Sequence, residues 1–228
     1  GALEAERSFT ANSAHELRTP IAAALAQTQR LTAELDDEAA RARARAIAAS
    51  LRRLSGLSEK LLQLAKAEGG GLVAERPAPL GPVLRLVIEE IDRRRDIADR
   101  LIVEMPEGGG APCDLDPDAF AILARNLVEN AAIHGAEEGR IVVRFDGRVL
   151  EVENDGPAVA PEVLTRLGRR FERGVTRGEG SGLGLAIVAA ICRGVGARFE
   201  MLSPVPGRGD GFLARVHLAG GGAKLTRS

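Results

Sequence analysis

The chain has 228 residues, of which 45% are hydrophobic and 28% charged, and its formal net charge is −1. This composition fits a globular protein of one large or two modest domains, and it gives no electrostatic reason to expect a nucleic acid or a membrane as partner. Aromatic residues make up only 3%, with neither Tyr nor Trp, which leaves little for stacking on bases. No apolar run reaches the ~18 residues of a membrane-spanning helix.

Cys113 and Cys192 lie far apart in the sequence. They fit neither a metal-ligand spacing nor a disulfide framework, so we expect two small buried apolar residues in a reducing cytoplasm. No signal peptide precedes the first helical sequence, and we expect the chain to be a piece of a larger protein.

Residues 1–68 predict a helical hairpin. Apolar and small residues spaced alternately by four and three run from Thr10 to Leu35, which is a heptad pattern. An acidic stretch at 36–38 then suits the start of a second helix, in which the same spacing runs from Ile47 to Ala65. One hairpin cannot bury so much apolar surface, so the pattern predicts a homodimeric four-helix bundle.

A glycine run at 69–71 and prolines at 77, 79 and 82 follow the hairpin. Because glycine and proline end helices, residues 69–79 are predicted to be a linker and hinge. The domain that follows is expected over 80–219, and the glycine-rich end, 220–228, is expected to be a flexible tail.

The second domain mixes helices and strands without a regular alternation. Asp116 followed by Pro117 is a typical helix start, and Asp146-Gly147 is a typical tight turn between strands. The predicted fold class is α+β, with an α/β sandwich in which helices pack on one face of a mixed sheet. Helices are predicted at 82–100, 116–132, 161–167 and 182–193, and strands at 101–105, 140–145, 148–152, 198–202 and 211–218.

The helix predicted at 116–132 carries a row of polar residues that continues just beyond it. These residues are spaced by four, so they share one helix face: Asn126, Asn130 and His134, with Glu129 beside them. Oxygen-bearing side chains in such a row can hold a hard cation such as Mg²⁺, which commonly bridges nucleotide phosphates. A solvated polar helix face explains the same residues equally well.

A second polar motif, Asn154-Asp155-Gly156, directly follows a predicted strand. A polar side chain before glycine at a strand end can present an oxygen to the exocyclic amine of a ligand. An ordinary turn accounts for the same residues without a ligand at least as often.

A glycine-rich loop at 178–184 runs into the apolar helix that starts near Gly182. Glycines let the backbone approach phosphates closely, and the start of a helix offers N–H groups and the positive end of a dipole. The loop matches neither a Rossmann fingerprint nor a Walker A loop, and by itself it is a weak signal.

A histidine on an amphipathic helix, such as His15, is by itself more often an ordinary residue than a functional one. The order of the motifs is more specific than any one of them. HELRTP, NLVENA, NDGPAV, RFER at 170–173 and GSGLGL resemble the H, N, G1, F and G2 boxes of the sensor histidine kinases of two-component systems, over about residues 5–218.

This resemblance implies a dimerisation and histidine-phosphotransfer domain followed by a catalytic ATP-binding domain with the Bergerat fold of gyrase, Hsp90 and MutL. His15 would be the phosphoacceptor on the outer face of the hairpin, since Leu17 takes a heptad position. Glu16 would accept the imidazole proton and Thr19 would help to dephosphorylate the partner regulator.

The resemblance also implies ATP and Mg²⁺ as cofactors, with Asn130 and, less directly, Asn126 at the metal-binding positions. Glu129 takes the acidic position beside them, and Phe171 would anchor a lid over the nucleotide. The other nucleotide-binding positions are His134, Asn154, Asp155, Gly156, Arg173, Arg177, Gly180, Ser181, Gly182, Leu183, Gly184 and Leu185.

The sequence departs from the family pattern in the G1 and N boxes. Asn154 stands where an Asp accepts the adenine amine, Asp155 is shifted by one position, and Ala158 replaces the second glycine. Ile133 stands where a phosphate-contacting Lys or Arg is usual, a role that His134 or the arginines of the lid would have to take over. We expect weaker nucleotide binding than is typical, because Asn accepts a hydrogen bond without charge assistance.

The implied function is phosphorylation of His15 with Mg·ATP and transfer of the phosphoryl group to an aspartate on a response-regulator receiver domain, with regulator phosphatase activity as well. The implied location is the cytoplasmic portion of an inner-membrane sensor, attached through regions absent from this chain. The alternatives are a kinase-deficient dimeric docking or phosphatase module, and an ATPase of the gyrase type, against which the HELRTP hairpin argues.

Overall fold

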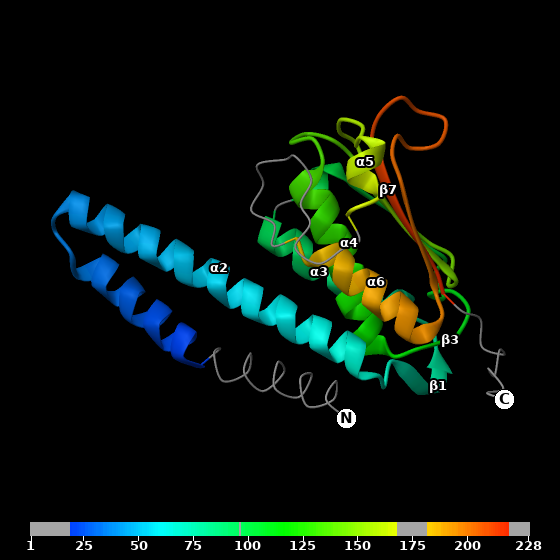
Figure 1. The fold of residues 1–228 in the computed structure, drawn as a ribbon, viewed down its shortest axis with the longest axis horizontal. Helices are drawn as coiled ribbons and strands as arrows, with labels where there is room; N and C mark the ends of the chain where they lie inside the picture. Colours follow the sequence, from blue (N-terminus) through cyan, green and yellow to red (C-terminus); the bar gives the residue numbers. More distant parts are fainter. Residues whose placement is uncertain (1–18, 96, 168–181, 219–228) are drawn as a thin grey trace. The chain divides into compact units, whose positions relative to one another are not determined.

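The computed structural model describes residues 19–95, 97–167 and 182–218 (Figure 1). The chain divides into two compact units, Gly1–Gly69 and Gly70–Ser228. The boundary therefore falls in the glycine run that follows the predicted hairpin. Within the described ranges, no helix combines the length and the apolar character needed to cross a bilayer.

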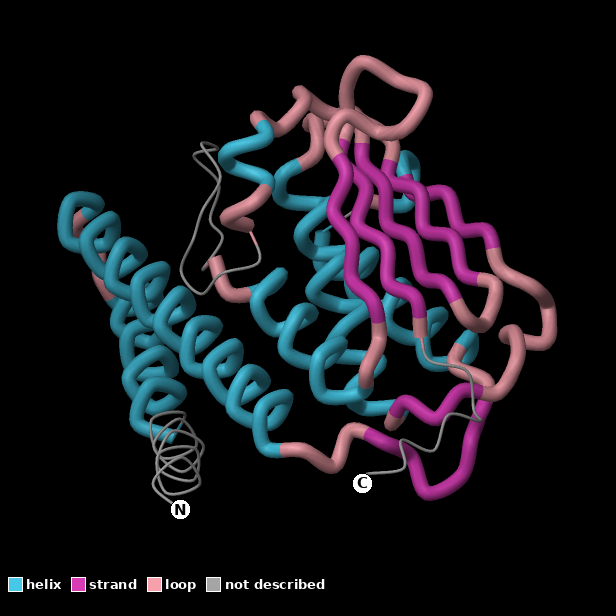
Figure 2. Tube along the Cα trace, turned by 45° about the vertical axis from the view of Figure 1, so that its right-hand side comes forward, coloured by secondary structure: helices cyan, strands magenta, loops and turns pink. Residues whose placement is uncertain are grey.

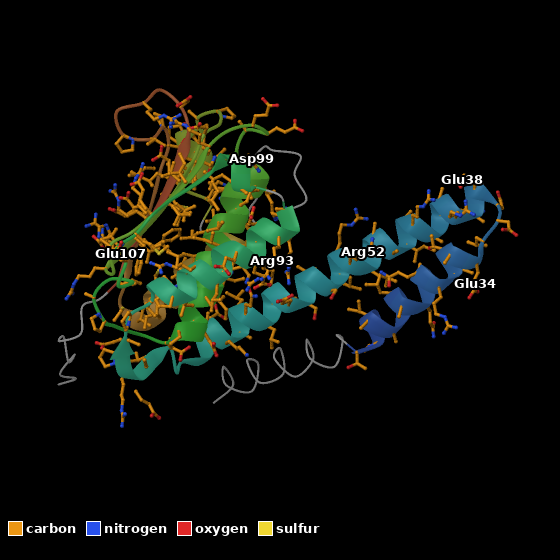
Figure 3. All side chains as sticks on the ribbon, turned by 180° about the vertical axis from the view of Figure 1, so that it is seen from behind. Glu34, Glu38, Arg52, Arg93, Asp99 and Glu107 are labelled. Atoms are coloured by element: carbon orange, nitrogen blue, oxygen red, sulfur yellow. The ribbon has the colours of Figure 1, made fainter. Side chains whose placement is uncertain are left out.

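The first unit is a helical hairpin, as the heptad pattern predicts. The described part of its first helix covers residues 19–34, and the second helix is α2 (Glu38–Gly69). The acidic connection starts α2: Asp37 Oδ1 accepts a hydrogen bond from Ala39 N at 3.0 Å. Arg41 Nη1 lies 2.6 Å from a carboxylate oxygen of Glu38, which is labelled at the end of the hairpin in Figure 3.

Small side chains let the two helices of the hairpin approach closely. Ala44 and Ala48 on α2 are buried, as is Ile21 on the first helix. Larger apolar side chains are left on the surface, with Leu31 48% exposed, Ile47 53% and Leu54 48%. An exposed apolar face on both helices is what a bundle with a second hairpin requires.

The second unit begins with a strand where the sequence predicts a linker. β1 (Val73–Ala78) pairs antiparallel with β3 (Cys113–Leu115), so this part of the predicted linker at 69–79 is a paired strand. The prolines that favoured a hinge also favour extended backbone, and a two-stranded sheet has only edge strands, where a missing N–H is tolerated. The register shift between the two paired positions fits this arrangement.

The main sheet has five strands in the order β2-β4-β5-β7-β6. Among the strand pairs of this sheet in the described residues, β2 and β4 run parallel and the other three pairs antiparallel, so the sheet is mixed, as predicted. Each strand lies where the sequence predicts one, and β5 continues to Asn154, beyond the predicted end at 152. The strands are β2 (Leu101–Glu104), β4 (Ile141–Phe145), β5 (Val149–Asn154), β6 (Arg198–Leu202) and β7 (Phe212–His217).

Helices cover one face of this sheet (Figure 2). The helix predicted at 82–100 ends earlier in the structure. Asp92 Oδ1 accepts a hydrogen bond from Ile97 N at 3.1 Å, and Ile97 is buried. A 3₁₀ turn at Ala98–Arg100 follows. The predicted helix at 161–167 ends early as well. The helices are α3 (Gly81–Arg95), α4 (Pro117–His134), α5 (Pro161–Leu164) and α6 (Gly184–Val195).

The two faces of β5 differ because side chains alternate along a strand. Leu150, Val152 and Asn154 alternate with Glu151 and Glu153. Leu150 and Val152 belong to the buried core, whereas the two glutamates form ion pairs with arginines of the neighbouring strands and of the β6–β7 loop. Asn154 therefore lies on the face of the sheet that the helices cover.

Both cysteines are buried and neither forms a disulfide, as predicted. Burial raises the pKa of Cys192 to about 12, which keeps its thiol protonated and unreactive at neutral pH.

Candidate functional site

The predicted row of polar residues lies on α4. Asp116 begins this helix, because its Oδ1 atom accepts hydrogen bonds from the N–H groups of Asp118 and Ala119, both at 3.0 Å, while Pro117 takes the first helical position. The opposite side of α4 is packed in the core. Asn130, like Glu129, is half-buried, whereas Asn126 is only 1% exposed.

Asn126 lies against the start of α6. Its Nδ2 atom donates a hydrogen bond to the Ile122 carbonyl at 2.7 Å. Its Oδ1 atom lies 3.2 Å from the position that a Cβ atom on Gly184 would occupy. The N-box helix and the G2 segment, which are far apart in the sequence, thus meet at these two residues, and the absence of a side chain at Gly184 permits the contact.

The start of α6 is suited to an anion. Leu183 is the N-cap residue, and its apolar side chain makes no capping hydrogen bond to α6. Gly182 has φ +70°, which favours glycine, and Leu183 is fully buried. Gly184 and Leu185 then begin the helix, and their N–H groups lie at its positive end.

Asn154 ends β5 on the helix-covered face of the sheet and is 4% exposed. Its Nδ2 atom donates a hydrogen bond to the Asp155 carbonyl at 3.2 Å. Nδ2 also lies 3.3 Å from the position that a Cβ atom on Gly135 would occupy, so the loop after α4 closes over this side chain. Gly156 continues the turn, and its carbonyl accepts a hydrogen bond from Gly211 N at 2.7 Å.

Asp155 is held between two arginines. Arg140 approaches its Oδ2 atom with both N and Nε at 3.1 Å, and Arg208 Nη1 lies 2.8 Å from its Oδ1 atom. Burial alone would raise the pKa of this carboxyl, but the hydrogen bonds from Arg208 and Arg140 outweigh it and lower the pKa. Asp155, predicted from the sequence as a nucleotide-binding residue, is thus engaged in ion pairs within the protein.

Sequence reasoning missed both arginines. Arg208 lies in the loop between β6 and β7, a glycine-rich stretch without periodicity, and Arg140 immediately precedes β4. Only the pairing of β5 with β4 and β7 brings them to the end of β5.

His134 ends α4 and is half-buried. Burial lowers the pKa of its imidazole, which is therefore mainly neutral at neutral pH. His134 can therefore form a hydrogen bond with a phosphate, but it does not supply the positive charge that a Lys or Arg at the position of Ile133 would bring.

The described residues hold no cluster of three or more His, Cys, Asp or Glu side chains that would bind a metal on its own. A metal held by amide oxygens together with a nucleotide needs no such cluster, since Mg²⁺ usually keeps several waters and binds substrate phosphates.

Thr19 is exposed and helical at the start of the described chain. The other predicted residues of the H box, F box and loop lie outside the described residues: His15, Glu16, Phe171, Arg173, Arg177, Gly180 and Ser181.

Comparison with known families matches both units. Residues 5–70 match the His Kinase A (phospho-acceptor) domain, and residues 115–220 match the histidine kinase-, DNA gyrase B-, and HSP90-like ATPase family. Fold and site thus define a phosphoacceptor hairpin joined to an ATPase domain. This combination argues against the gyrase-type alternative, for which a phosphoacceptor hairpin has no use.

Curated sensor proteins are similar to most of this chain. The chain is 34% identical to the sensor protein CseC of Streptomyces avermitilis, covering 91% of this chain and 40% of CseC. It is 35% identical to the sensor protein kinase PmrB of Pseudomonas aeruginosa, covering 83% and 41%. It is 32% identical to the sensor protein QseC of Escherichia coli, covering 92% and 47%. The chain belongs to the sensor histidine kinases, and it spans less than half the length of these relatives.

Solved structures share the fold. Full-length ShkA in complex with AMPPNP superposes with a TM-score of 0.63 at 22% identity, covering 93% of this chain and 46% of ShkA. The histidine kinase AdeS of Acinetobacter baumannii gives a TM-score of 0.58 at 22% identity, covering 91% of this chain and 98% of AdeS.

Proposed function

We propose that this chain is the core of a sensor kinase that binds Mg·ATP in its second unit and phosphorylates His15 in its first. The observation that carries this proposal is the meeting of Asn126 and Gly184, which joins the N-box helix to the start of α6 in a chain that also carries a phosphoacceptor domain. The phosphoryl group would then pass to an aspartate on a response-regulator receiver domain.

The transfer to His15 is a substitution at phosphorus. One imidazole nitrogen attacks the γ-phosphorus, the bond from that phosphorus to the bridging oxygen breaks, and ADP leaves. Glu16, next to His15, would accept the proton on the other ring nitrogen and so keep the attacking nitrogen unprotonated. The protein otherwise contributes positioning and charge stabilisation, which dominate phosphoryl transfer.

The second unit offers groups for each part of ATP. The N–H groups at Gly184 and Leu185 would bind phosphate oxygens, and Asn154 would accept a hydrogen bond from the adenine amine. Asn130 would be the amide ligand of Mg²⁺, because it lies one turn after Asn126 on the same face of α4 and is half-buried. The burial of Asn126 and its contacts support a role in packing more than in metal binding. Bound Mg²⁺ would neutralise charge on the phosphates.

The hairpin would form a homodimer. Ile47 and Leu54, both on α2 and seven residues apart, are 53% and 48% exposed, so the heptad face remains uncovered in one copy. A second hairpin packed on this face would complete a four-helix bundle. We further propose that the exposed Thr19, one helical turn after His15, assists dephosphorylation of the regulator, and that the chain is the cytoplasmic portion of a membrane sensor.

The test is incubation of the chain with γ-labelled ATP and Mg²⁺. We expect an acid-labile, base-stable phosphoprotein, no label in His15→Gln, and label that passes to an added receiver domain. Label that is retained in the His15→Gln variant would contradict the assignment of His15 as the phosphoacceptor. A Thr19→Ala variant should still become labelled but should lose regulator phosphatase activity.

A kinase-deficient docking or phosphatase module is the second candidate. The neutral Asn154 and the neutral His134 favour it, because both leave the nucleotide site with less charge than the family pattern provides. This candidate predicts no label on His15 while binding to a receiver domain persists.

A further inference from the structure

The orientation of the Asn154 amide is fixed by its surroundings. Nδ2 donates to the Asp155 carbonyl at 3.2 Å and lies 3.3 Å from the Cβ position of Gly135. Among the described residues, this is the one hydrogen bond of the Asn154 side chain, so the opposite end of the amide, Oδ1, is left to accept a hydrogen bond from a ligand.

Amide orientation matters because an asparagine can serve two different bases. Its Oδ1 atom accepts from the amine that adenine carries at its sixth position, and its Nδ2 atom donates to the carbonyl oxygen that guanine carries there. An aspartate at this position could only accept. An asparagine selects adenine only if its amide is prevented from turning over.

The Asp155 carbonyl that orients the amide is itself held in place from several sides. It accepts a second hydrogen bond, from Ala136 N, at 2.8 Å. The carboxylate of the same residue is held by Arg140 at 3.1 Å and by Arg208 at 2.8 Å. Arg208 also reaches Glu153 Oε1 at 3.0 Å, so one side chain of the β6–β7 loop holds two carboxylates, one on either side of Asn154 in the sequence.

The β6–β7 loop is joined to the same turn by its backbone. Gly211 N donates to the Gly156 carbonyl at 2.7 Å, and Ser203 Oγ donates to the Gly211 carbonyl at 2.6 Å while it accepts from Val159 N at 2.8 Å. This loop is thus a fixed support for the residues that follow Asn154.

We propose that Arg208 is a positioning residue for purine selectivity: by holding Asp155, it keeps the Asn154 amide in the orientation that accepts from adenine and excludes guanine. The inference rests on the proposed function, because it assumes that a nucleotide binds beside Asn154. It assigns a selectivity role to a loop that the family motifs do not include.

The test measures the Kd of the ATP analogue AMPPNP and of its guanine counterpart GMPPNP for the full chain with excess Mg²⁺. In Arg208→Gln we expect the preference for the adenine nucleotide to fall by about fivefold, the size of one neutral hydrogen bond. The matched control is Arg215→Gln, which removes an arginine of β7 that pairs with Glu151 at 2.6 Å and not with Asp155. Its preference should not change.

A second background separates orientation from general loosening. In Asn154→Asp the carboxylate accepts whichever way it turns, so adding Arg208→Gln should leave the adenine preference unchanged. An equal fall in both backgrounds, or no fall in Arg208→Gln, would overturn the inference while leaving the kinase function intact. Failure of the unsubstituted chain to bind either analogue would instead overturn the proposed function and, with it, this inference.

Discussion

Asn126 Oδ1 lies 3.2 Å from the point where a side chain on Gly184 would begin, although the two residues stand on different helices. Gly184→Ala places a methyl group at this point. Because Asn126 is held by the Ile122 carbonyl, we expect the start of α6 to shift and the affinity for ATP to fall by about threefold to tenfold. The free energy of unfolding should fall by no more than about 2 kcal/mol, since the helix preference of alanine offsets part of the cost of crowding. Isothermal titration and chemical denaturation measure the two effects.

The control for Gly184→Ala is Gly56→Ala on α2, where an added Cβ atom would meet nothing within 4 Å. It should raise the free energy of unfolding by about 0.5–1 kcal/mol, since alanine favours a helix, and leave ATP affinity unchanged. Unaltered ATP binding in Gly184→Ala would show that the start of α6 does not contact the nucleotide.

Asn154→Asp restores the acidic residue of the family pattern. We expect ATP to bind about fivefold more tightly, because a charged acceptor strengthens a hydrogen bond to the adenine amine by roughly 1 kcal/mol. Titration with an ATP analogue at neutral pH measures the change. Weaker binding of adenine nucleotides would mean that the side chain at 154 does not face the base.

Leu54→Glu puts a charge on the exposed apolar face of α2, where Leu54 is 48% exposed in one copy of the chain. Burying that charge in a bundle is costly, so we expect a shift from dimer to monomer in light scattering. Ala42→Glu, an exposed position on α2 outside the heptad spacing, makes the same charge change and should remain dimeric. If Leu54→Glu and Ala42→Glu both remain dimeric, the dimer forms through another face of the hairpin.

Arg100→Ala should destabilise the second unit. The guanidinium donates hydrogen bonds to the Ala136 carbonyl at 2.9 Å and the Ala132 carbonyl at 3.3 Å, at the end of α4. Their loss should lower the free energy of unfolding by about 1–2 kcal/mol. Arg95→Ala, which removes an exposed arginine from the end of α3, should change it by less than about 0.5 kcal/mol in the same urea titration.

The pH dependence of stability should report on Asp155. Its pKa is lowered in the folded chain, so its ionised form stabilises the fold above the unfolded pKa, and this contribution is lost as the pH falls through the folded pKa. Asp155→Asn should therefore reduce stability at neutral pH and flatten the acid part of the curve of unfolding free energy against pH. A slope equal to that of the unsubstituted chain would argue that Asp155 is not ion-paired in solution.

Local patterns predicted most of the fold. The cap at Asp116, the heptad spacing and the turn at Asp146-Gly147 each depend on neighbours in sequence, and the described residues contain the helices and strands that these patterns predicted. The strand β1 was not predicted, because β3, its partner among the described residues, has three residues and is too short to produce a pattern.

The site was less accessible from the sequence than the fold. Motif order indicated Asn126, Asn154 and Gly184, but it could not show that Asn126 is buried or that Arg208 holds Asp155. Both facts depend on which strands pair and how tightly helices approach, and neither leaves a periodic trace in the sequence.

The connection between α2 and β1 limits how far the second unit can move from the end of α2. Asp116 N donates to the Leu72 carbonyl at 2.8 Å, so the second unit is already fixed at Leu72 while α2 continues to Gly69. Only Gly70 and Gly71 remain as the joint, with φ of +91° and +75°. Two residues span at most about 7 Å, so the ATP-binding unit can rotate about the end of α2 but cannot drift away from it. In the proposed transfer, the approach of the γ-phosphate to His15 would therefore depend on rotation at two glycines and not on the length of a flexible linker.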